Sequence, residues 1–313
     1  MLATRCPKPV RPCVAPISGI RSSVDILFHQ LASGLTSGAV YASLALALVM
    51  IWRSTHHLNF AQGEMAMFST YLALIMIEAG LSYWSAFALS LIVSFGLGML
   101  IQHYVVRPSS KGSPLASVIT FVALLAIVHS LASWLFSPVL REFPSPFTAT
   151  VLPGNSYLSP HALGILLITL LELAIVWLFF RFTRTGLAMR AVASHPQSSE
   201  LVGIPVARML ALGWGLAAAL GAVAGMMIAP IVYLDPNMMA GVLLYGFAAA
   251  LVGGIDNPWG AVAGGLIVGL LDGLLGGWLI GPELKMSVAL GLIVLVLIIR
   301  PAGLFGQPTI HRV

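Results

Sequence analysis

The stretch ILFHQLASGLTSGAVYASLALALVMIW, residues 26–52, contains no Asp, Glu, Lys or Arg. Its side chains are mostly apolar or small, and charged residues stand directly on either side, at Asp25 and Arg53. A helix of roughly 20 apolar residues crosses the hydrocarbon core of a bilayer. We therefore expect the chain to enter a membrane here, with a spanning helix at 31–51.

Uncharged stretches of the same kind recur along the chain. Backbone groups in lipid must be satisfied within the spanning segment, and long unbroken apolar runs do this as helices, whereas barrel strands would alternate in polarity. The sequence thus predicts an all-α fold, a polytopic transmembrane helical bundle of about eight to nine spans with discontinuous or re-entrant helices. The further expected spans are 59–78, 84–106, 115–136, 161–180, 209–230, 259–279 and 285–300.

The composition supports an integral membrane protein. Charged residues make up 8% of the chain and hydrophobic residues 59%, whereas a soluble domain carries roughly 25% charged residues. The net charge is +5, but the arginines stand singly at the ends of apolar runs. That pattern sets membrane topology and differs from a nucleic-acid-binding patch. Nucleic acid is therefore not an expected partner.

Two basic loops, at 107–111 and 181–208, predict the orientation, because Arg and Lys in short loops favour the cytoplasmic side. Counting back through the spans places the N-terminus outside, in conflict with the basic residues of segment 1–23. This proline-rich segment has no apolar run, and we expect a disordered extension before a membrane domain at 24–306. Both cysteines, Cys6 and Cys13, lie in it, so the membrane domain has none for a disulfide, metal or nucleophile.

Signatures of enzyme chemistry are missing from the sequence. There is no HExxH zinc motif, no GxSxG nucleophile elbow and no GxxxxGK[ST] phosphate loop. The chain is therefore not expected to be an enzyme or to bind ATP through a P-loop. Acidic residues within or beside spans are the most informative polar groups, because a charge in lipid is costly. They are Glu64, Glu172 and Asp272.

Two roles stay open for Glu64, which follows the sequence NFAQG at 59–63. In the structural one, Asn59 caps a helix, Gln62 bonds back to it as in a capping box, and the Glu64 carboxylate favours the positive end of the helix dipole. In the other, Glu64 takes part in transport.

The other two acidic residues also have open roles. Glu172 lies among leucines, and we expect it to face the bundle and to pair with a histidine such as His129 or His103. Asp272 interrupts a glycine-rich helix and either lines a pathway or bonds to a neighbouring backbone.

Three prolines, Pro230, Pro236 and Pro258, flank the short apolar stretch 239–254. Because proline interrupts a helix, we expect the backbone to be broken on both sides of this stretch. A broken helix at membrane depth would line a cavity, as in transporters, and a simple hairpin turn is the alternative. The sequence leaves open whether the stretch crosses the membrane or turns back.

Glycines recur at every fourth position between Gly260 and Gly277. This spacing puts small residues on one helix face, where another helix can approach closely. Intramolecular packing is the expected use, and a subunit interface is the alternative.

The loop 181–208 has the pattern of two short cytoplasmic helices. Leu187, Arg190 and Ala191 have helical spacing, Pro196 suits the first position of a second helix, and Gly203 suits the position just past its end. Such a pair could fit a groove on a soluble partner. The alternative is an amphipathic loop that lies on the membrane surface.

Five segments together resemble the membrane-spanning permease subunits of branched-chain amino acid ABC transporters. The likeness covers about residues 24–306 and leaves 307–313 as a tail. One departure is Asp272, where such sequences lead us to expect Glu. The segments are GLTSGAVYA at 34–42, LNFAQGE at 58–64, GLAMRAVA with HP and LVGI at 186–204, GGIDNPWGAVAGG at 253–265 and RPAGLFG at 300–306.

The resemblance implies an importer in the bacterial cytoplasmic membrane. Its partners would be a second permease chain, two ATPase subunits that bind the ATP, and a solute-binding protein outside. The cargo would be branched-chain or related amino acids, urea or similar small solutes, and the chain itself would hold no cofactor. The implied ATPase-coupling residues are Gly186, Arg190, Ala193, Pro196 and Gly203, and the expected translocation pathway holds Asn59, Gln62, Glu64 and Asp272.

A self-contained carrier driven by protons or sodium is the alternative function, with the three acidic residues as its ion-binding groups. A membrane enzyme is a third possibility, for which the sequence offers no nucleophile or metal set.

Overall fold

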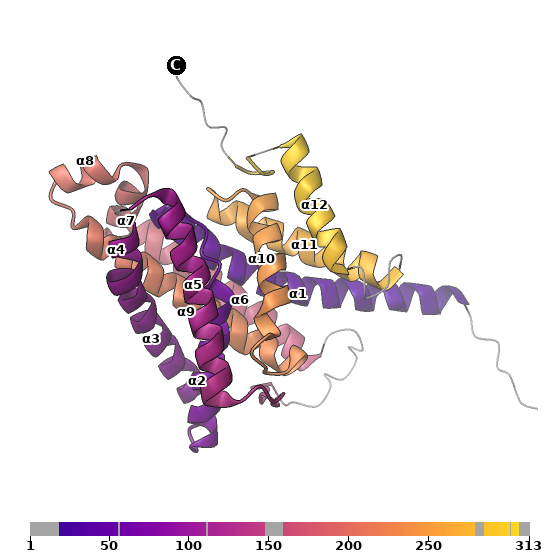
Figure 1. Cartoon of the computed structure of the whole chain (residues 1–313). Helices are drawn as coiled ribbons and strands as arrows, with labels where there is room; N and C mark the ends of the chain where they lie inside the picture. The colour runs from indigo at the N-terminus through magenta and orange to yellow at the C-terminus, as the bar shows by residue number, and fades with distance from the viewer. Residues whose placement is uncertain are drawn as a thin grey trace, which may run out of the picture.

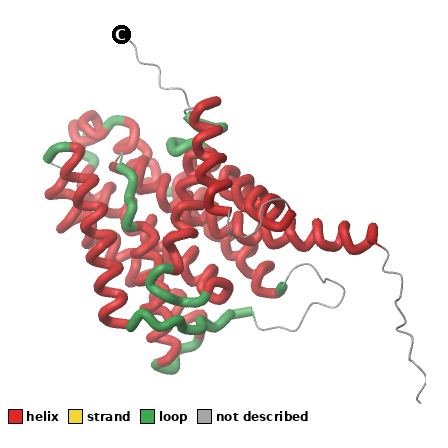
Figure 2. Tube along the Cα trace, turned by 45° about the vertical axis from the view of Figure 1, so that its right-hand side comes forward, coloured by secondary structure: helices red, strands yellow, loops and turns green. Residues whose placement is uncertain are grey.

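The computed structural model describes residues 19–55, 57–110, 112–147, 159–278, 285–300 and 302–306. Within these ranges the chain is a bundle of helices, as the ribbon and tube views show (Figures 1 and 2), and its one β-bridge joins the loop residues Arg141 and Leu234. The expected all-α fold is confirmed. The elements are α1 (Gly19–Thr55), α2 (Gln62–Glu78), α3 (Tyr83–Ile101), the π-helical turn η1 (Gln102–Val106), α4 (Arg107–Ser109), α5 (Pro114–Phe136), α6 (Pro160–Phe182), α7 (Arg184–Ser194), α8 (Pro196–Leu201), α9 (Val206–Val232), α10 (Met238–Gly253), α11 (Pro258–Trp278) and α12 (Lys285–Ile299).

Six helical segments in the described ranges are long and apolar enough to cross a membrane. They are α1, the continuous run from α3 to α4, α5, α6, α9 and α11. Two shorter apolar helices, α10 and α12, accompany them. Each expected span falls on one of these helices or on α2, which has 17 residues. The chain is thus a polytopic helical membrane protein.

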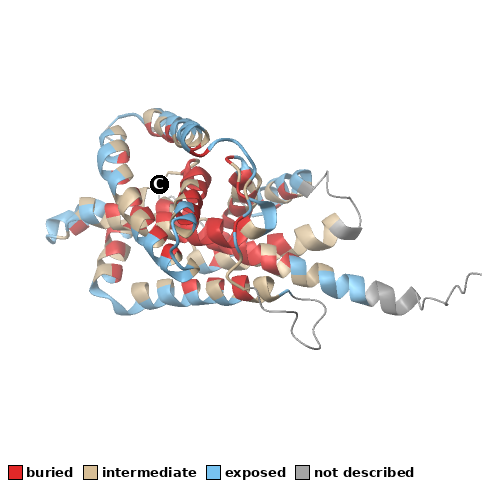
Figure 3. Ribbon diagram, turned by 90° about the horizontal axis from the view of Figure 1, so that it is seen from below, coloured by how far each residue is buried: buried red, intermediate tan, exposed pale blue. Residues whose placement is uncertain are grey.

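Helix α1 forms the centre of the bundle. It packs against α11, α9, α10 and α6, and 89% of its most apolar window is buried within the protein, against 22% for α3, α5 and α6. Figure 3 shows the buried residues concentrated in the middle of the bundle. A helix with apolar side chains on every face is stable where other helices surround it. The apolar outer faces of α3, α5 and α6 suit contact with lipid.

Glycines allow α11 to touch two neighbours along its backbone. Gly265 packs against Ala42 of α1, where an added Cβ would lie 2.5 Å from the Ala42 Cα. Gly264 lies on the α10 side, where an added Cβ would be 2.7 Å from the backbone nitrogen of Gly253. Intramolecular packing, which we expected from the glycine spacing, is therefore confirmed on both faces of α11.

Pro230 lies inside α9, which continues through it to Val232. Proline in the last turn removes only one helical hydrogen bond, and the helix ends instead at Tyr233, whose φ is 64°. The chain does break on both sides of α10. Loop residue Leu234, before α10, pairs with Arg141 beyond the end of α5, whereas Asp256 after α10 meets the last turn of α1. Helix α10 therefore runs from one end of the bundle to the other.

Helix α1 begins at Gly19, inside the segment 1–23 that we expected to be an extension. The rest of that segment, residues 1–18, and the tail 307–313 lie outside the described residues.

Candidate functional site

The loop 181–208 forms the two helices expected from its sequence, α7 and α8. The Thr183 hydroxyl caps α7 by accepting a hydrogen bond from the backbone N–H of Gly186 at 2.9 Å. Pro196 lies in the first turn of α8. Gly203, with φ of +86°, ends α8: its N–H donates to Glu200 O and the next N–H, of Ile204, donates to Ser199 O, both at 3.0 Å. This pair of bonds is a Schellman motif, which explains the glycine.

The buried face of α7 holds it against the membrane-spanning body. Met189 and Val192 are buried, and Gly186 lies so close to α6 that an added Cβ would be 2.7 Å from the Cα of Phe180. The position of α7 is therefore fixed by α6 at this glycine.

The end of α8 presents apolar side chains to the exterior, and sequence reasoning missed them. Leu201 is 89% exposed and Val202 is 82% exposed, and α8 lies at the outer edge of the bundle (Figure 1). The sequence did carry a signal for them, because two apolar residues in a polar loop directly precede the glycine that ends the helix. These two side chains give α8 a small apolar surface that a partner protein could cover.

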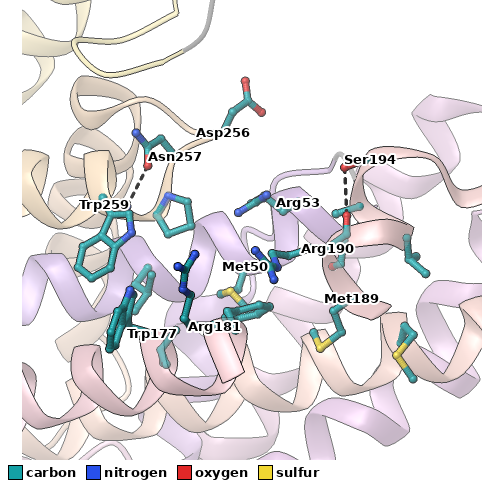
Figure 4. A pocket seen from close by; sticks show the side chains of 18 of the residues that line it. Met50, Arg53, Trp177, Arg181, Met189, Arg190, Ser194, Asp256, Asn257 and Trp259 are labelled. Carbon is teal, nitrogen blue, oxygen red and sulfur yellow. Dashed lines mark hydrogen bonds between the residues drawn. The ribbon is translucent and has the colours of Figure 1, made fainter. Parts of the chain in front are cut away.

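An open cavity of about 930 Å³ lies beside α7 at the same end of the bundle. Arg190 and Ala193 line it from α7, and Arg53 and Arg181 line it from the last turns of α1 and α6 (Figure 4). Asp256, in the turn between α10 and α11, lies at its rim and accepts a hydrogen bond from Trp52 Nε1 at 2.9 Å. The structure thus divides the predicted coupling residues: Arg190 and Ala193 face a cavity, whereas Gly186, Pro196 and Gly203 shape the backbone.

Three of the four residues predicted for the pathway meet at the start of α2. Asn59 and Gln62 are buried, and Gln62 Nε2 donates to the carbonyl of Ala217 on α9 at 2.8 Å. The predicted capping box is wrong: the N-cap of α2 is Ala61, and Asn59 instead accepts from the Ala61 N–H in a turn before the helix. The Gln62 side chain bonds to α9 because the two helices pack closely there.

Glu64, in the first turn of α2, pairs with His129 of α5, with 3.2 Å between Oε2 and Nδ1. The predicted pairing of Glu172 with His129 or His103 is therefore wrong. Glu172 is buried on α6, and neither of its carboxylate oxygens has a hydrogen-bond partner within the described part of the chain.

Asp272 belongs to a separate cluster. It lines a small cavity together with Tyr245 of α10 and Ala289 of α12, and Tyr245 stacks on Tyr41 of α1 with ring centroids 4.8 Å apart. The structure therefore does not bring Asp272 together with the polar group at the start of α2. No group of three metal-binding side chains occurs among the residues that the structure describes.

Replacing Gln62 with Met is expected to lower the free energy of unfolding by about 1–3 kcal/mol. The change removes the hydrogen bond to Ala217 and also takes Oε1 away from the buried Asn59 amide, which lies at 3.4 Å. Gln102→Met is the matched control, because Gln102 is equally buried but its Oε1 has no partner in the described structure. Thermal unfolding in detergent measures both variants. Equal losses in the two would show that the Gln62 hydrogen bonds add nothing to stability.

The spanning helices define a multi-pass helical membrane protein. The short helices α7 and α8 lie at the end that carries Arg53, Arg181 and Arg190. The family model described as branched-chain amino acid transport system / permease component matches residues 30–297. The chain belongs to this family.

The curated relatives match over nearly their whole length. The high-affinity branched-chain amino acid transport system permease protein BraD of Pseudomonas aeruginosa is 30% identical, with 91% of this chain and 97% of the relative covered. LivH of Escherichia coli K12, with the same description, is 28% identical over the same shares. The solved structure of PsaBC from Streptococcus pneumoniae in complex with Fab has a TM-score of 0.44 and 16% identity, covering 89% of this chain and 92% of that one.

These relatives support the permease expected from the sequence and not the ion-coupled carrier. The chain is a transporter subunit of the cell inner membrane. By the charge rule, we expect the end that carries Arg53, Arg181 and Arg190 to face the cytoplasm.

Proposed function

We propose that this chain forms part of the membrane channel of an ABC importer and docks its ATPase subunits through α7 and α8. The observation that carries the proposal is the exposure of Leu201 and Val202, at 89% and 82%, at the cytoplasmic end of the bundle. Apolar side chains in that position gain free energy when a partner removes them from water. The cargo is a branched-chain or related amino acid, by analogy with the relatives named above.

The five predicted coupling residues act through α7 and α8. Gly186 holds α7 against α6, Pro196 starts α8 and Gly203 ends it. Arg190 and Ala193 face the cavity between α7 and the membrane helices, so movement of α7 changes their surroundings. A movement of the ATPase that displaces the exposed end of α8, at Leu201 and Val202, is thereby transmitted through α7 to α1 and α6.

The partners in this proposal are two ATPase subunits, which bind the ATP, together with a second permease chain and an external solute-binding protein. Transport then requires two arrangements of the permease whose balance is shifted by ATP-driven closure of the ATPase pair. Asn59, Gln62 and Glu64 belong to the translocation pathway because the chain is not helical just before α2, where Asn59 is nonetheless buried. Asp272 remains a predicted pathway residue in its own cluster.

The double variant Leu201→Glu, Val202→Glu tests the docking. We expect the wild-type chain, purified in mild detergent from its native membrane, to retain a P-loop ATPase in comparable amount. The variant should lose most of that ATPase, because two buried apolar contacts contribute about 1.5–3 kcal/mol each. Quantitative mass spectrometry of the purified complex measures the ratio.

A matched control is Val139→Glu, Leu140→Glu. These residues are 63% and 59% exposed and lie at the opposite end of the bundle, after α5. The control should retain the ATPase. If the α8 variant keeps the ATPase as well as the control does, α8 is not the docking surface.

A further inference from the structure

Three arginine side chains converge in the cavity beside α7. Arg53 of α1, Arg181 of α6 and Arg190 of α7 extend into the same space (Figure 4). None of them forms an ion pair with a carboxylate within the described ranges, and the Nε of Arg190 is buried there without a hydrogen-bond partner. Asp256, the one carboxylate among the lining residues, accepts a hydrogen bond from Trp52 and interacts electrostatically with Arg53, so three arginines share the cavity with a single carboxylate. The cavity therefore has an excess of positive charge that an anion would neutralise.

The other part of the lining is apolar. Its side chains come from the membrane-spanning helices α1, α6 and α11 and would contact hydrocarbon more favourably than water. A small soluble anion makes no use of such a surface, whereas a molecule with a charged head and an acyl chain matches both parts. The apolar lining includes Leu46, Met50, Leu173, Val176, Phe180 and Val262.

The depth of the cavity matches the headgroup layer of the membrane. Arg53 and Arg181 lie in the last turns of spanning helices α1 and α6. Trp177 and Trp259, which are 43% and 57% exposed, stand at the same cavity (Figure 4). Tryptophan is enriched at membrane interfaces, because its ring is apolar and its N–H is polar.

We infer that this cavity binds an anionic phospholipid of the cytoplasmic leaflet, with its phosphate against Arg53, Arg181 and Arg190. Guanidinium groups bind phosphate oxygens through paired, charge-assisted hydrogen bonds. Basic pockets between membrane helices on the cytoplasmic side are suited to such headgroups. Because the three arginines come from three helices, a bound lipid links α7 to α1 and α6. Lipid binding itself does not depend on the ATPase docking proposed above.

The test compares lipid binding by the full chain purified in detergent. Phosphatidylglycerol is titrated with phosphatidylcholine as the neutral competitor, and retained lipid is counted by native mass spectrometry. The wild type should bind phosphatidylglycerol preferentially. Arg53→Gln, Arg181→Gln should weaken this binding by about tenfold or more, because two of the three guanidinium groups that would hold the phosphate are lost.

The matched control is Arg107→Gln, Arg208→Gln, which removes the same charge from exposed arginines that do not line the cavity. It should leave phosphatidylglycerol binding within about twofold of wild type, which is less than 0.5 kcal/mol. Equal losses in both double variants would mean general attraction to positive charge and would overturn the proposal. Displacement of the lipid by equimolar inorganic phosphate would also overturn it, because the site would then select a free anion.

Discussion

Gly269→Ala is expected to prevent stable folding of this permease. The added methyl group would overlap the backbone of Gly38 on α1 and would lie 2.6 Å from the carbonyl oxygen of Gly34. Both neighbours are backbone atoms of the central helix, so no side chain can rotate away. Overpacking typically lowers the free energy of unfolding by about 1–3 kcal/mol. We expect Gly269→Ala to lower it by more than about 3 kcal/mol.

The matched controls are Gly291→Ala in α12 and Gly96→Ala in α3. Both are helical glycines, and an added Cβ at either meets nothing within 4 Å. Because alanine favours a helix over glycine by about 1 kcal/mol, these controls should be neutral or stabilising. The amount of monodisperse protein after detergent extraction, and its thermal unfolding, distinguish the cases. A Gly269→Ala protein as stable as the controls would contradict the close contact of α1 and α11.

Gly186→Val should abolish most substrate uptake while leaving the membrane-spanning body folded. The valine side chain would displace α7 from Phe180 on α6, because the added Cβ would be only 2.7 Å from the Phe180 Cα. A shift in α7 moves the cavity residues Arg190 and Ala193, and it also moves the exposed end of α8 that follows them. If the packing of Gly186 on α6 contributes about 1–3 kcal/mol to the coupling free energy between the ATPase and transport, uptake should fall by roughly 5- to 150-fold.

Uptake of a radiolabelled branched-chain amino acid and substrate-stimulated ATP hydrolysis measure the effect, with thermal unfolding as the folding check. Gly112→Val is the matched control at the same end, since an added Cβ there makes only ordinary contacts at 3.4 Å. The control should transport normally. Normal uptake by Gly186→Val would show that the seating of α7 on α6 is not part of the coupling.

The helices could be predicted from sequence because an apolar run in lipid has few structural solutions. Local signals also located α7 and α8, since Pro196 and Gly203 mark helix ends by their own backbone chemistry. The break expected before 239–254 is present, but Pro230 does not mark its position, because proline near a helix end costs little. The break came instead at Tyr233, which carries no such signal in its residue type.

Contacts between helices could not be predicted in the same way. Helix α5 is apolar on all sides, so its sequence does not show that His129 turns toward Glu64 on α2. The arginine-lined cavity combines Arg53, Arg181 and Asp256, which come from three distant segments. Its existence depends on tertiary packing, whereas the charge pattern only indicated which end is cytoplasmic.

The central position of α1 has a consequence for biogenesis. Its main partners, α9 and α11, are synthesised only after residue 205. Until then the faces of α1 that later meet α9 and α11 are open to lipid, where an apolar helix is stable because its backbone groups are satisfied internally. Assembly therefore follows insertion, as a separate stage. A ribosome that stalls before α11 would release a chain in which no helix packs against the backbone surface at Gly34 and Gly38.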